Sequence, residues 1–294
     1  MPDPLVTVGM PIRNGMPLLP EALASVTGQS YGNLEIVISD NGSSDGSWEY
    51  CCKVAAGDPR IQLFRQVPEL TAWQNFRYVL QAARGDLFAW AAHDDWRSPN
   101  YVSELAAAIQ AKPGAVLAYS NLVQVEGVSG DEKSFPQESV FDIQNLSTLK
   151  RLRLLAPAHC AETYGLFRRA ELQTYPWLDI DFAPDVPLLI YMSLRGDIVK
   201  ARDATFYQRM GASPKSAKAR ALANSYKDDV APLRVIRLSW ASATNATQAV
   251  EGGVRFRVCV FLNIYYSLRY SLTKTQLFEA SPPFLQQLWR NIMG

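Results

Sequence analysis

Short apolar runs alternate with amphipathic stretches through the first 120 residues, and this alternation constrains the fold more than any other feature. The runs, of which the first is rich in β-branched residues, predict strands at residues 5–10, 34–39, 61–64, 87–91 and 115–119. Apolar side chains at helical spacing predict intervening helices at residues 18–26, 44–54, 76–83 and 101–111. Ser44 is expected to cap the second of these helices. Alternation through short connections is typical of a mostly parallel sheet flanked by helices, so we expect an α/β fold.

The pattern is weaker beyond residue 120. Gly, Asp and Glu residues after Asn121 predict an exposed loop before a helix. The elements expected in this part are a helix at 146–155, a strand at 163–167, a helix at 186–194, strands at 198–200 and 205–207, and helices from Pro214 onward. Gly, Ser and Pro cluster at residues 211–214. We therefore predict an α/β domain over residues 1–213 and a helical C-terminal extension over residues 214–294.

Charge and cysteine usage exclude several classes of protein. Lys and Arg total 29 against 28 Asp and Glu, and the formal charge of +1 argues against a protein that wraps nucleic acid. The four cysteines show no zinc-ligand spacing, which favours a reducing cytoplasm. The first residues lack the pattern of a signal peptide, and no uncharged run approaches the roughly 20 residues of a membrane-spanning helix. We therefore expect a cytoplasmic protein without a nucleic-acid partner.

Polar clusters follow three of the predicted strands, at the places where ligands bind in open parallel sheets. They are Pro11 to Asn14, Asp40 to Gly46, and His93 to Asp95. The chain has neither a G-x-G-x-x-G fingerprint after its first strand nor a phosphate-binding P-loop. Hydride transfer from a dinucleotide and P-loop chemistry are therefore disfavoured.

The adjacent carboxylates of Asp94 and Asp95 allow two interpretations. Held together at a strand end, they would repel unless a cation shares them, and Mg²⁺ or Mn²⁺ prefers such oxygen ligands. Acidic residues also suit the start of a helix, here the one predicted from Tyr101. Asp40 and Asp45 raise a similar choice. A carboxylate after a strand can bind a nucleobase or ribose, while Asn-Gly and Asp-Gly pairs also form turns.

Three longer motifs follow one another in the first half of the chain. They are Val6-Thr7-Val8-Gly9-Met10-Pro11-Ile12-Arg13-Asn14-Gly15, then Leu34-Glu35-Ile36-Val37-Ile38-Ser39-Asp40-Asn41-Gly42-Ser43-Ser44-Asp45-Gly46-Ser47, then Ala83-Arg84-Gly85-Asp86-Leu87-Phe88-Ala89-Trp90-Ala91-Ala92-His93-Asp94-Asp95 with Pro99. Together they resemble the inverting nucleotide-sugar glycosyltransferases of family 2, over about residues 5–210. The resemblance implies a Rossmann-like GT-A fold, with a nucleotide-binding half at about 1–120 and an acceptor-binding half at about 121–213.

The resemblance assigns a set of nucleotide-binding residues. It implies that Pro11 and Asn14 line the nucleotide pocket and that Asp40 binds the base, as a family aspartate does for uracil. Asp45 looks like the second acid of that loop, and Asn75 is similar to a family asparagine beside the nucleotide. The expected donor is therefore a nucleoside diphosphate-sugar, such as a UDP-sugar.

The resemblance also implies a Mg²⁺ or Mn²⁺ site. Asp94 looks like the last acid of the Asp-x-Asp metal motif, which contacts the cation that bridges the diphosphate, and Asp95 lies next to it as a second metal ligand. The sequence departs from the motif at its first position, where Ala92 replaces the acid. His93, in the middle, is expected to be either a ligand in the donor site or a polar neighbour.

Asp185, near the start of a predicted helix, is the expected catalytic base. An inverting transfer needs a base to take the proton of the acceptor hydroxyl as that hydroxyl attacks the anomeric carbon. The resemblance places this acid well after the metal motif, with Asp179 and Asp181 as rivals, and an ordinary acid at a helix N-terminus is the alternative interpretation. Arg209 is similar to a family position whose cation helps to neutralise the leaving diphosphate, although Met210 stands near the expected histidine.

The activity implied is that of a hexosyl or related transferase, which moves a sugar with inversion onto a glycan or lipid-linked acceptor. Bacterial cell-surface polysaccharide synthesis is the expected setting. Two other classes stay open. One is an inactive sugar-nucleotide binding or scaffold protein, because Ala92 replaces the first metal acid, and the other is a nucleotidyltransferase of similar sheet topology.

The C-terminal extension carries an apolar stripe. Apolar residues from Val254 to Leu268 recur at helical spacing and are flanked by arginines. Such a stripe predicts docking on the catalytic domain or self-association, or else peripheral contact with the inner face of the membrane.

Overall fold

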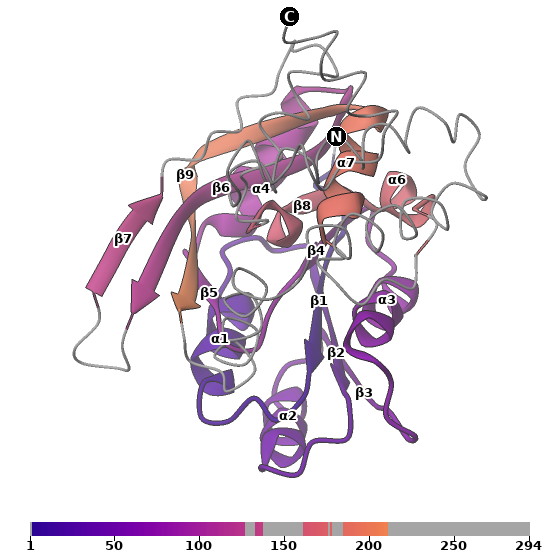
Figure 1. The fold of residues 1–294 in the computed structure, drawn as a ribbon, viewed down its shortest axis with the longest axis vertical. Helices are drawn as coiled ribbons and strands as arrows, with labels where there is room; N and C mark the ends of the chain where they lie inside the picture. The colour runs from indigo at the N-terminus through magenta and orange to yellow at the C-terminus, as the bar shows by residue number, and fades with distance from the viewer. Residues whose placement is uncertain (1, 127–132, 138–160, 176, 178–184, 211–294) are drawn as a thin grey trace, which may run out of the picture. The chain divides into compact units, whose positions relative to one another are not determined.

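The computed structural model describes residues 2–126, 133–137, 161–175, 177 and 185–210, coloured in Figure 1. They belong to one compact unit made of Met1–Leu146 and His159–Ala212. The predicted helices at 146–155 and beyond Pro214, the predicted boundary at 211–214, and both Asp179 and Asp181 lie outside the described residues. The division into two domains therefore stays a prediction. No helix among the described residues is long and apolar enough to cross a membrane.

A mixed sheet flanked by helices forms this unit (Figure 1). The strands follow the order β3-β2-β1-β4-β8-β6-β9-β5 across the sheet, and β7 pairs with β6. The strands are β1 (Val6–Ile12), β2 (Leu34–Asp40), β3 (Ile61–Arg65), β4 (Leu87–Trp90), β5 (Trp96–Arg97), β6 (Ala115–Glu126), β7 (Lys133–Gln137), β8 (Leu166–Arg168) and β9 (Asp197–Met210). The helices are α1 (Leu19–Thr27), α2 (Ser47–Ala55), α3 (Ala72–Ala82), α4 (Tyr101–Ala111), the 3-10 helix η1 (Ala161–Tyr164), α6 (Arg169–Gln173) and α7 (Asp185–Arg195).

Parallel pairing is confined mainly to the first half of the sheet. β3, β2, β1 and β4 run in the same direction, with Val6 opposite both Leu34 and Leu87. In the second half, β8 runs antiparallel to β4 and to β6, while β6 and β9 are parallel. The predicted α/β class is confirmed, and the antiparallel strands make the complete sheet mixed.

Helices cover both faces of the parallel half. On one face, Val8 and Met10 of β1 share the main hydrophobic core with Leu19 of α1 and with residues of α4. On the other face, α3 packs on β1 and β2, and a Cβ atom added to Gly9 would lie 2.8 Å from Val79. Only glycine permits this close approach of α3. The carboxyl ends of β1, β2 and β4 are thereby fixed side by side, and they carry the loops of the predicted site.

The second half departs from the sequence prediction. The loop predicted from Asn121 is instead a continuation of β6 to Glu126, where β6 pairs with β7 and β9. The two strands predicted at 198–200 and 205–207 are one strand, β9, whose register on β6 shifts before Asn121. The strand predicted at 163–167 is η1 followed by β8. These elements depend on pairing between segments far apart in the sequence, which local patterns do not encode.

The start of α2 also differs, because Ser44 does not cap it. The helix begins at Ser47 after Gly46, which has a φ of 92°. Glycine adopts this left-handed conformation without the steric cost that a side chain brings. The Ser44 N–H instead donates to Asn14 (N to Oδ1 3.0 Å), so it links two loops.

Candidate active site

Asn14 joins the loop after β1 to the loop after β2. Its backbone N–H donates to Ser43 (N to Oγ 2.9 Å), and its side chain accepts from the Ser44 N–H (3.0 Å). Asn14 has a φ of 50°, in the left-handed region that asparagine adopts more often than most residues. It is exposed at the loop junction and shapes the backbone there, while its predicted contact with a nucleotide stays a prediction.

Asp45 makes a second connection between the same loops. Its Oδ2 atom accepts from the Met16 N–H (2.8 Å), and its Oδ1 atom accepts from the N–H and the hydroxyl of Ser47 (3.1 and 2.6 Å). Ser47 also accepts from the Gly15 N–H (N to Oγ 2.9 Å). Burial acts to raise the pKa of Asp45, but the hydrogen bonds from Ser47 and Met16 together outweigh it and lower that pKa. Asp45 therefore holds the two loops together.

Asp40, the predicted base-binding acid, is fully buried at the end of β2. Its Oδ2 atom accepts from the Ser43 N–H (3.1 Å) and lies 3.6 Å from Nε of Arg65, whose guanidinium lies over the Trp48 ring (5.0 Å). Its Oδ1 atom is buried and has no hydrogen-bond partner among the described residues. A buried acceptor without a donor costs about 1–3 kcal/mol, so this oxygen is suited to an N–H group brought by a ligand.

The segment between β3 and α3 borders the Asp40 site. Asn41 exchanges two hydrogen bonds with the backbone of Leu70, both of 2.8 Å. Arg13, after β1, pairs with Glu69 of the same segment (2.5 Å). These contacts hold the segment against the loops after β1 and β2.

Asn75 lies under the end of β2 and is 3% exposed. Its Oδ1 atom accepts from the Ser39 hydroxyl (2.6 Å), and its Nδ2 atom donates to the Ser39 carbonyl (3.0 Å). Pro11 is buried in β1 directly opposite Ser39. Asn75 therefore ties α3 to the strand end that carries Asp40. Direct contact of Asn75 or Pro11 with a nucleotide stays a prediction.

Asp94 and Asp95 follow β4 but have different surroundings. Asp95 is 5% exposed and accepts from the backbone N–H of Arg209 (Oδ1 to N 2.8 Å). Burial, followed by the charge of Asp94, raises the pKa of Asp95 to about 7, against the lowering effects of Arg209 and Arg97. Asp94 is partly exposed, and its carboxylate makes no hydrogen bond or ion pair with other described residues. Neither acid caps α4, whose N-cap is Asn100, so the helix-cap interpretation is wrong.

Arg209, on β9, holds this loop from the protein side. Its Nη1 atom donates to the Asp94 carbonyl (3.2 Å), and its Nη2 atom pairs with Glu21 of α1 (2.7 Å). The guanidinium lies over the Trp96 ring (4.6 Å), and 2% of the side chain is exposed. Arg209 is thus placed to position the Asp94 backbone. The predicted contact with a leaving diphosphate stays a prediction, and it would require the guanidinium to leave these partners.

The part of the chain that the structure describes contains no group of three or more His, Cys, Asp or Glu side chains arranged to hold a metal ion. His93 packs beside Gly15, where an added Cβ atom would lie 3.2 Å from its ring. Ala92 has no ligand atom in its side chain. Among the described residues that follow β4, the Asp94 carboxylate is partly exposed and makes no hydrogen bond or ion pair with another described residue. It fits a cation that is bound mainly by phosphate oxygens and water, as Mg²⁺ often is.

Asp185 is the first residue of α7. Its charge and those of the acids that follow β4 act on the same group, the buried hydroxyl of Tyr164. Its pKa is raised well above the usual range, first by burial and then by the negative charges of Asp95, Asp94 and Asp185. The charges of the predicted base and of the predicted metal ligands thus influence one hydroxyl group, while the roles of these acids stay predictions.

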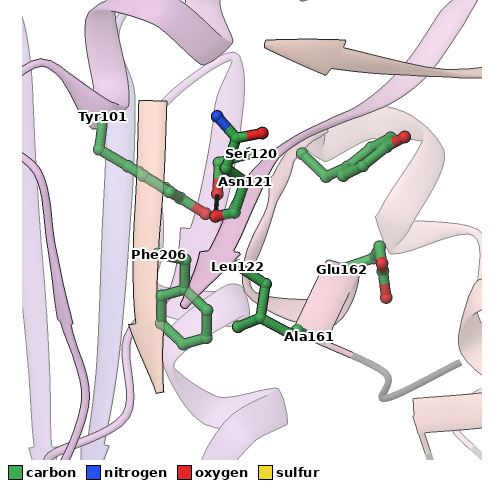
Figure 2. Close-up of a pocket in the computed structure, with 8 residues that line it drawn as sticks. Tyr101, Ser120, Asn121, Leu122, Ala161, Glu162 and Phe206 are labelled. Carbon is green, nitrogen blue, oxygen red and sulfur yellow. Dashed lines mark hydrogen bonds between the residues drawn. The ribbon is translucent and has the colours of Figure 1, made fainter. Parts of the chain in front are cut away.

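Glu162, in η1, is a site residue that the sequence patterns do not reveal. It is 8% exposed, and its Oε2 atom has no hydrogen-bond partner among the described residues. Burial raises its pKa to about 7, with Asp185 adding to the rise and its own backbone N–H and Lys200 opposing it. Glu162 lines a cavity of about 10 Å³ together with residues of α4, β6, η1 and β9. Figure 2 shows Glu162 among the residues that line this cavity. The available signal is that Glu162 is the single Asp, Glu, Lys or Arg between Arg153 and Arg168.

These features define the fold of the protein. A Rossmann-like half carries acids after β2 and β4, a mixed half adds an acid at the start of α7, and the arrangement matches the GT-A fold of solved glycosyltransferases. The chain belongs to glycosyl transferase family 2, whose model matches residues 7–175.

Two solved structures show the shared fold. S. aureus TarS in complex with UDP-GlcNAc has a TM-score of 0.66 and 16% identity, over 94% of this chain and 79% of TarS. The Pyrobaculum calidifontis mannosyltransferase PcManGT, in complex with GDP-Man and Mn²⁺, has a TM-score of 0.59 and 16% identity, over 99% of this chain and 80% of PcManGT. At these identities the likeness establishes the fold alone.

Curated relatives are also glycosyltransferases. An uncharacterized glycosyltransferase of Rickettsia felis is 27% identical over 177 residues, which are 57% of this chain and 29% of that protein. Glycosyltransferase GlyG of Streptococcus pneumoniae serotype 4 is 27% identical over 148 residues, which are 48% of this chain and 49% of GlyG. The chain thus matches less than half of the length of either relative.

Proposed function

We propose that this glycosyltransferase moves a sugar from a nucleoside diphosphate-sugar to an acceptor hydroxyl, with inversion at the anomeric carbon. The observation that carries the proposal is the Asp94 carboxylate, which is partly exposed after β4 and makes no hydrogen bond or ion pair with other described residues. After burial, the charges of Asp94 and Asp185 both contribute to the raised pKa of the Tyr164 hydroxyl. TarS and PcManGT, which share the fold, were solved with UDP-GlcNAc and GDP-Man.

Asp40 is the proposed site for the nucleobase. Its buried Oδ1 atom lacks a donor among the described residues, and the imide N–H of uracil supplies one. Guanine also offers N–H donors, which makes a GDP-sugar the competing donor. We favour a UDP-sugar, with Asn14 and Asp45 shaping the loops around it.

Asp94, with Asp95 next to it, is the proposed site of a Mg²⁺ or Mn²⁺ ion. When bound, such an ion neutralises charge on the diphosphate leaving group. Support comes from the open Asp94 carboxylate and from Arg209, which holds the backbone carbonyl of Asp94 (3.2 Å) and so fixes where the side chain starts. PcManGT, with the same fold, was solved with Mn²⁺.

Asp185 is the proposed general base. The acceptor oxygen attacks the anomeric carbon, the bond from that carbon to the diphosphate oxygen breaks, and Asp185 takes the hydroxyl proton. One displacement from the face opposite the leaving group inverts the configuration. Base catalysis of this kind contributes about 10²–10⁴ in rate.

A glycan or lipid-linked glycan is the proposed acceptor, in the synthesis of a bacterial cell-surface polysaccharide. The Rickettsia and Streptococcus relatives, which are named as glycosyltransferases, support the bacterial part of this proposal. The proposal includes a cytoplasmic location at the inner face of the membrane, with peripheral contact or self-association through residues 214–294.

Release of free nucleoside diphosphate tests the proposal. The full chain is incubated with UDP-sugars or GDP-sugars, a mixture of glycan and lipid-linked acceptors, and Mg²⁺, Mn²⁺ or a chelator. We expect UDP release that requires both the cation and the acceptor, and a loss of about 10²–10⁴ in Asp185→Asn. Asp203→Asn, at an exposed acid of β9, is the matched control and should keep full activity.

Other outcomes contradict specific parts of the proposal. Pyrophosphate release would identify a nucleotidyltransferase, and donor binding without turnover across the panel would identify a scaffold protein. A product that retains the anomeric configuration of the donor would exclude inversion. Full activity in Asp185→Asn would remove Asp185 as the base and direct attention to Asp179 and Asp181.

A further inference from the structure

Glu162 lies on a short helix that packs against the strand before the proposed cation ligand and against the helix that begins with the proposed base. The 3-10 helix that carries it, η1, packs against β4, β6 and α7. Asp94 follows the end of β4 at Trp90 by four residues, and α7 begins with Asp185. The steps proposed above give the Glu162 carboxyl group no role.

The Glu162 carboxyl group is removed from water without a full set of partners. It is 8% exposed, and its Oε2 atom has no hydrogen-bond partner among the described residues. The cavity beside it, which Tyr119 of β6 also lines, has about 10 Å³, close to the space of one water molecule. Buried polar groups left in this state are rare, and shifted carboxyl groups concentrate at functional sites.

Charged and titratable groups face Glu162 from the elements around it. Lys200 of β9 favours the ionised carboxylate, whereas Asp185 of α7 disfavours it. Burial raises the pKa of Tyr101 on α4, and the charge of Glu162 adds to this rise. The Tyr101 hydroxyl donates to the Tyr164 carbonyl of η1 (3.1 Å). Among the described acids, Asp185 is the carboxylate whose charge acts on Glu162.

We propose that Glu162 is a positioning residue for the catalytic base, and that its carboxyl group forms a charge-coupled pair with Asp185 that keeps Asp185 a strong base. The inference rests on the role of Asp185 proposed above. A negative charge on Glu162 makes Asp185 bind a proton more tightly, so Asp185 accepts the proton of the acceptor hydroxyl more readily. No proton passes between the two groups, and Glu162 acts through its charge alone.

Carboxyl-carbon NMR titration of the full chain tests the coupling without turnover. The Glu162 signal is the one that disappears in Glu162→Gln. We expect its midpoint at about pH 7 in the parent protein and at lower pH in Asp185→Asn, because that substitution removes a charge that raises it. Asp203→Asn should leave the midpoint where it is. An unchanged midpoint in Asp185→Asn overturns the proposal.

The pH dependence of kcat tests whether the coupling reaches catalysis. In the parent protein, kcat should increase further as Glu162 ionises around pH 7. Glu162→Gln should lack this increase and have a kcat about three- to tenfold lower above it, with an unchanged acceptor KM. Glu162→Asp keeps a charge and should restore part of the increase. A Glu162→Gln profile that matches the parent, or an effect confined to the acceptor KM, overturns the proposal.

The positioning role and the proposed function fail in different ways. If Asp185→Asn keeps full turnover, Asp185 is not the base, and the positioning role of Glu162 falls with it. If Asp185→Asn is inactive while Glu162→Gln has the pH profile of the parent, the positioning role fails alone.

Discussion

Two regions of the molecule carry acids: the loops after β1 and β2, and the region formed by the β4 end and η1. The regions differ in whether the carboxylates accept hydrogen bonds from other described residues. In the loops, Asp45 accepts hydrogen bonds from Met16 and Ser47. In the other region, Asp94 has no such bond with a described residue, and Glu162 keeps a buried oxygen without a partner. A carboxylate surrounded by donors fixes the backbone, whereas an unsatisfied one is available to a cation, a substrate or a proton.

Two acids depart from this comparison: Asp95, at the β4 end, accepts from the Arg209 N–H (2.8 Å), and Asp40 departs in the opposite direction. It belongs to the loop after β2, yet its Oδ1 atom is buried without a partner among the described residues, like Oε2 of Glu162. Its neighbour in the same loop, Asp45, is fully engaged. One loop thus combines a structural acid with an acid that we propose for ligand binding.

Asp94→Asn should have the largest effect of the changes that test the comparison. The substitution removes a charge but keeps the shape of a side chain that makes no hydrogen bond with other described residues. We expect kcat/KM to fall by about 10²–10³, equivalent to about 2.7–4 kcal/mol, with an unchanged Tm. Nucleoside diphosphate release and calorimetric unfolding measure the two quantities. A variant with full activity and a lowered Tm would show that Asp94 stabilises the fold, as Asp45 does, and does not bind a ligand.

Arg209→Met should have the next largest effect, on stability. The substitution removes the ion pair with Glu21, the hydrogen bond to the Asp94 carbonyl and the contact with Trp96. We expect the free energy of unfolding to fall by about 2–3 kcal/mol in urea titrations. Arg209→Lys keeps the charge and should recover part of this loss. An unchanged free energy of unfolding in Arg209→Met would show that the β4 end does not depend on these three contacts of Arg209.

Ser47→Ala should have a smaller effect, also on stability. Ser47 is fully buried, and its loss leaves the Gly15 N–H without its acceptor. We expect a loss of about 1–2 kcal/mol in the free energy of unfolding, with kcat nearly unchanged. Ser44→Ala is the matched control, because Ser44 is exposed and acts through its backbone N–H. A greater loss in Ser44→Ala than in Ser47→Ala would contradict the observed start of α2.

Asp45→Asn should have the smallest effect, and one that depends on pH. The pKa of Asp45 is lowered in the folded protein, so its charge stabilises the fold above its unfolded pKa of about 3.9. We expect a difference of about 1 kcal/mol between parent and variant at pH 7, reduced by solvent exposure, that closes as the pH falls through the folded pKa. Unfolding titrations at several pH values measure it. If the difference in the free energy of unfolding widened toward low pH, the ionised Asp45 carboxylate would not be the form that stabilises the fold.

Local sequence patterns predict the first half of the fold well. Its strands are short apolar runs, although β1 continues through Pro11 to Ile12, and its helices repeat apolar residues at helical spacing. The second half depends on the long pairing of β6 with β9, in which Ala115 lies opposite Asp197. Short segments such as Trp96–Arg97 are strands because β9 is beside them. Such pairing is a tertiary effect that composition and periodicity do not carry.

The site follows the same division. Residue type and position after a strand identify Asp40 and Asp94, because ligand-binding loops follow the carboxyl ends of parallel strands. The same rules do not distinguish Asp45 from Asp40, since the difference depends on which donors each carboxylate meets. Glu162 follows no strand end, and what distinguishes it is its burial and its Oε2 atom, which has no hydrogen-bond partner among the described residues.

The central claim is that Asp94 binds a cation together with the ligand, whereas Asp45 only holds the loops together. Calorimetry tests it most directly, by titrating UDP into the full chain with Mn²⁺ or with a chelator. The parent protein and Asp45→Asn are predicted to bind UDP more tightly with Mn²⁺ than with the chelator. Asp94→Asn is predicted to lose that difference while keeping its Tm. A full Mn²⁺-dependent gain in affinity in Asp94→Asn would contradict the assignment of the two acids.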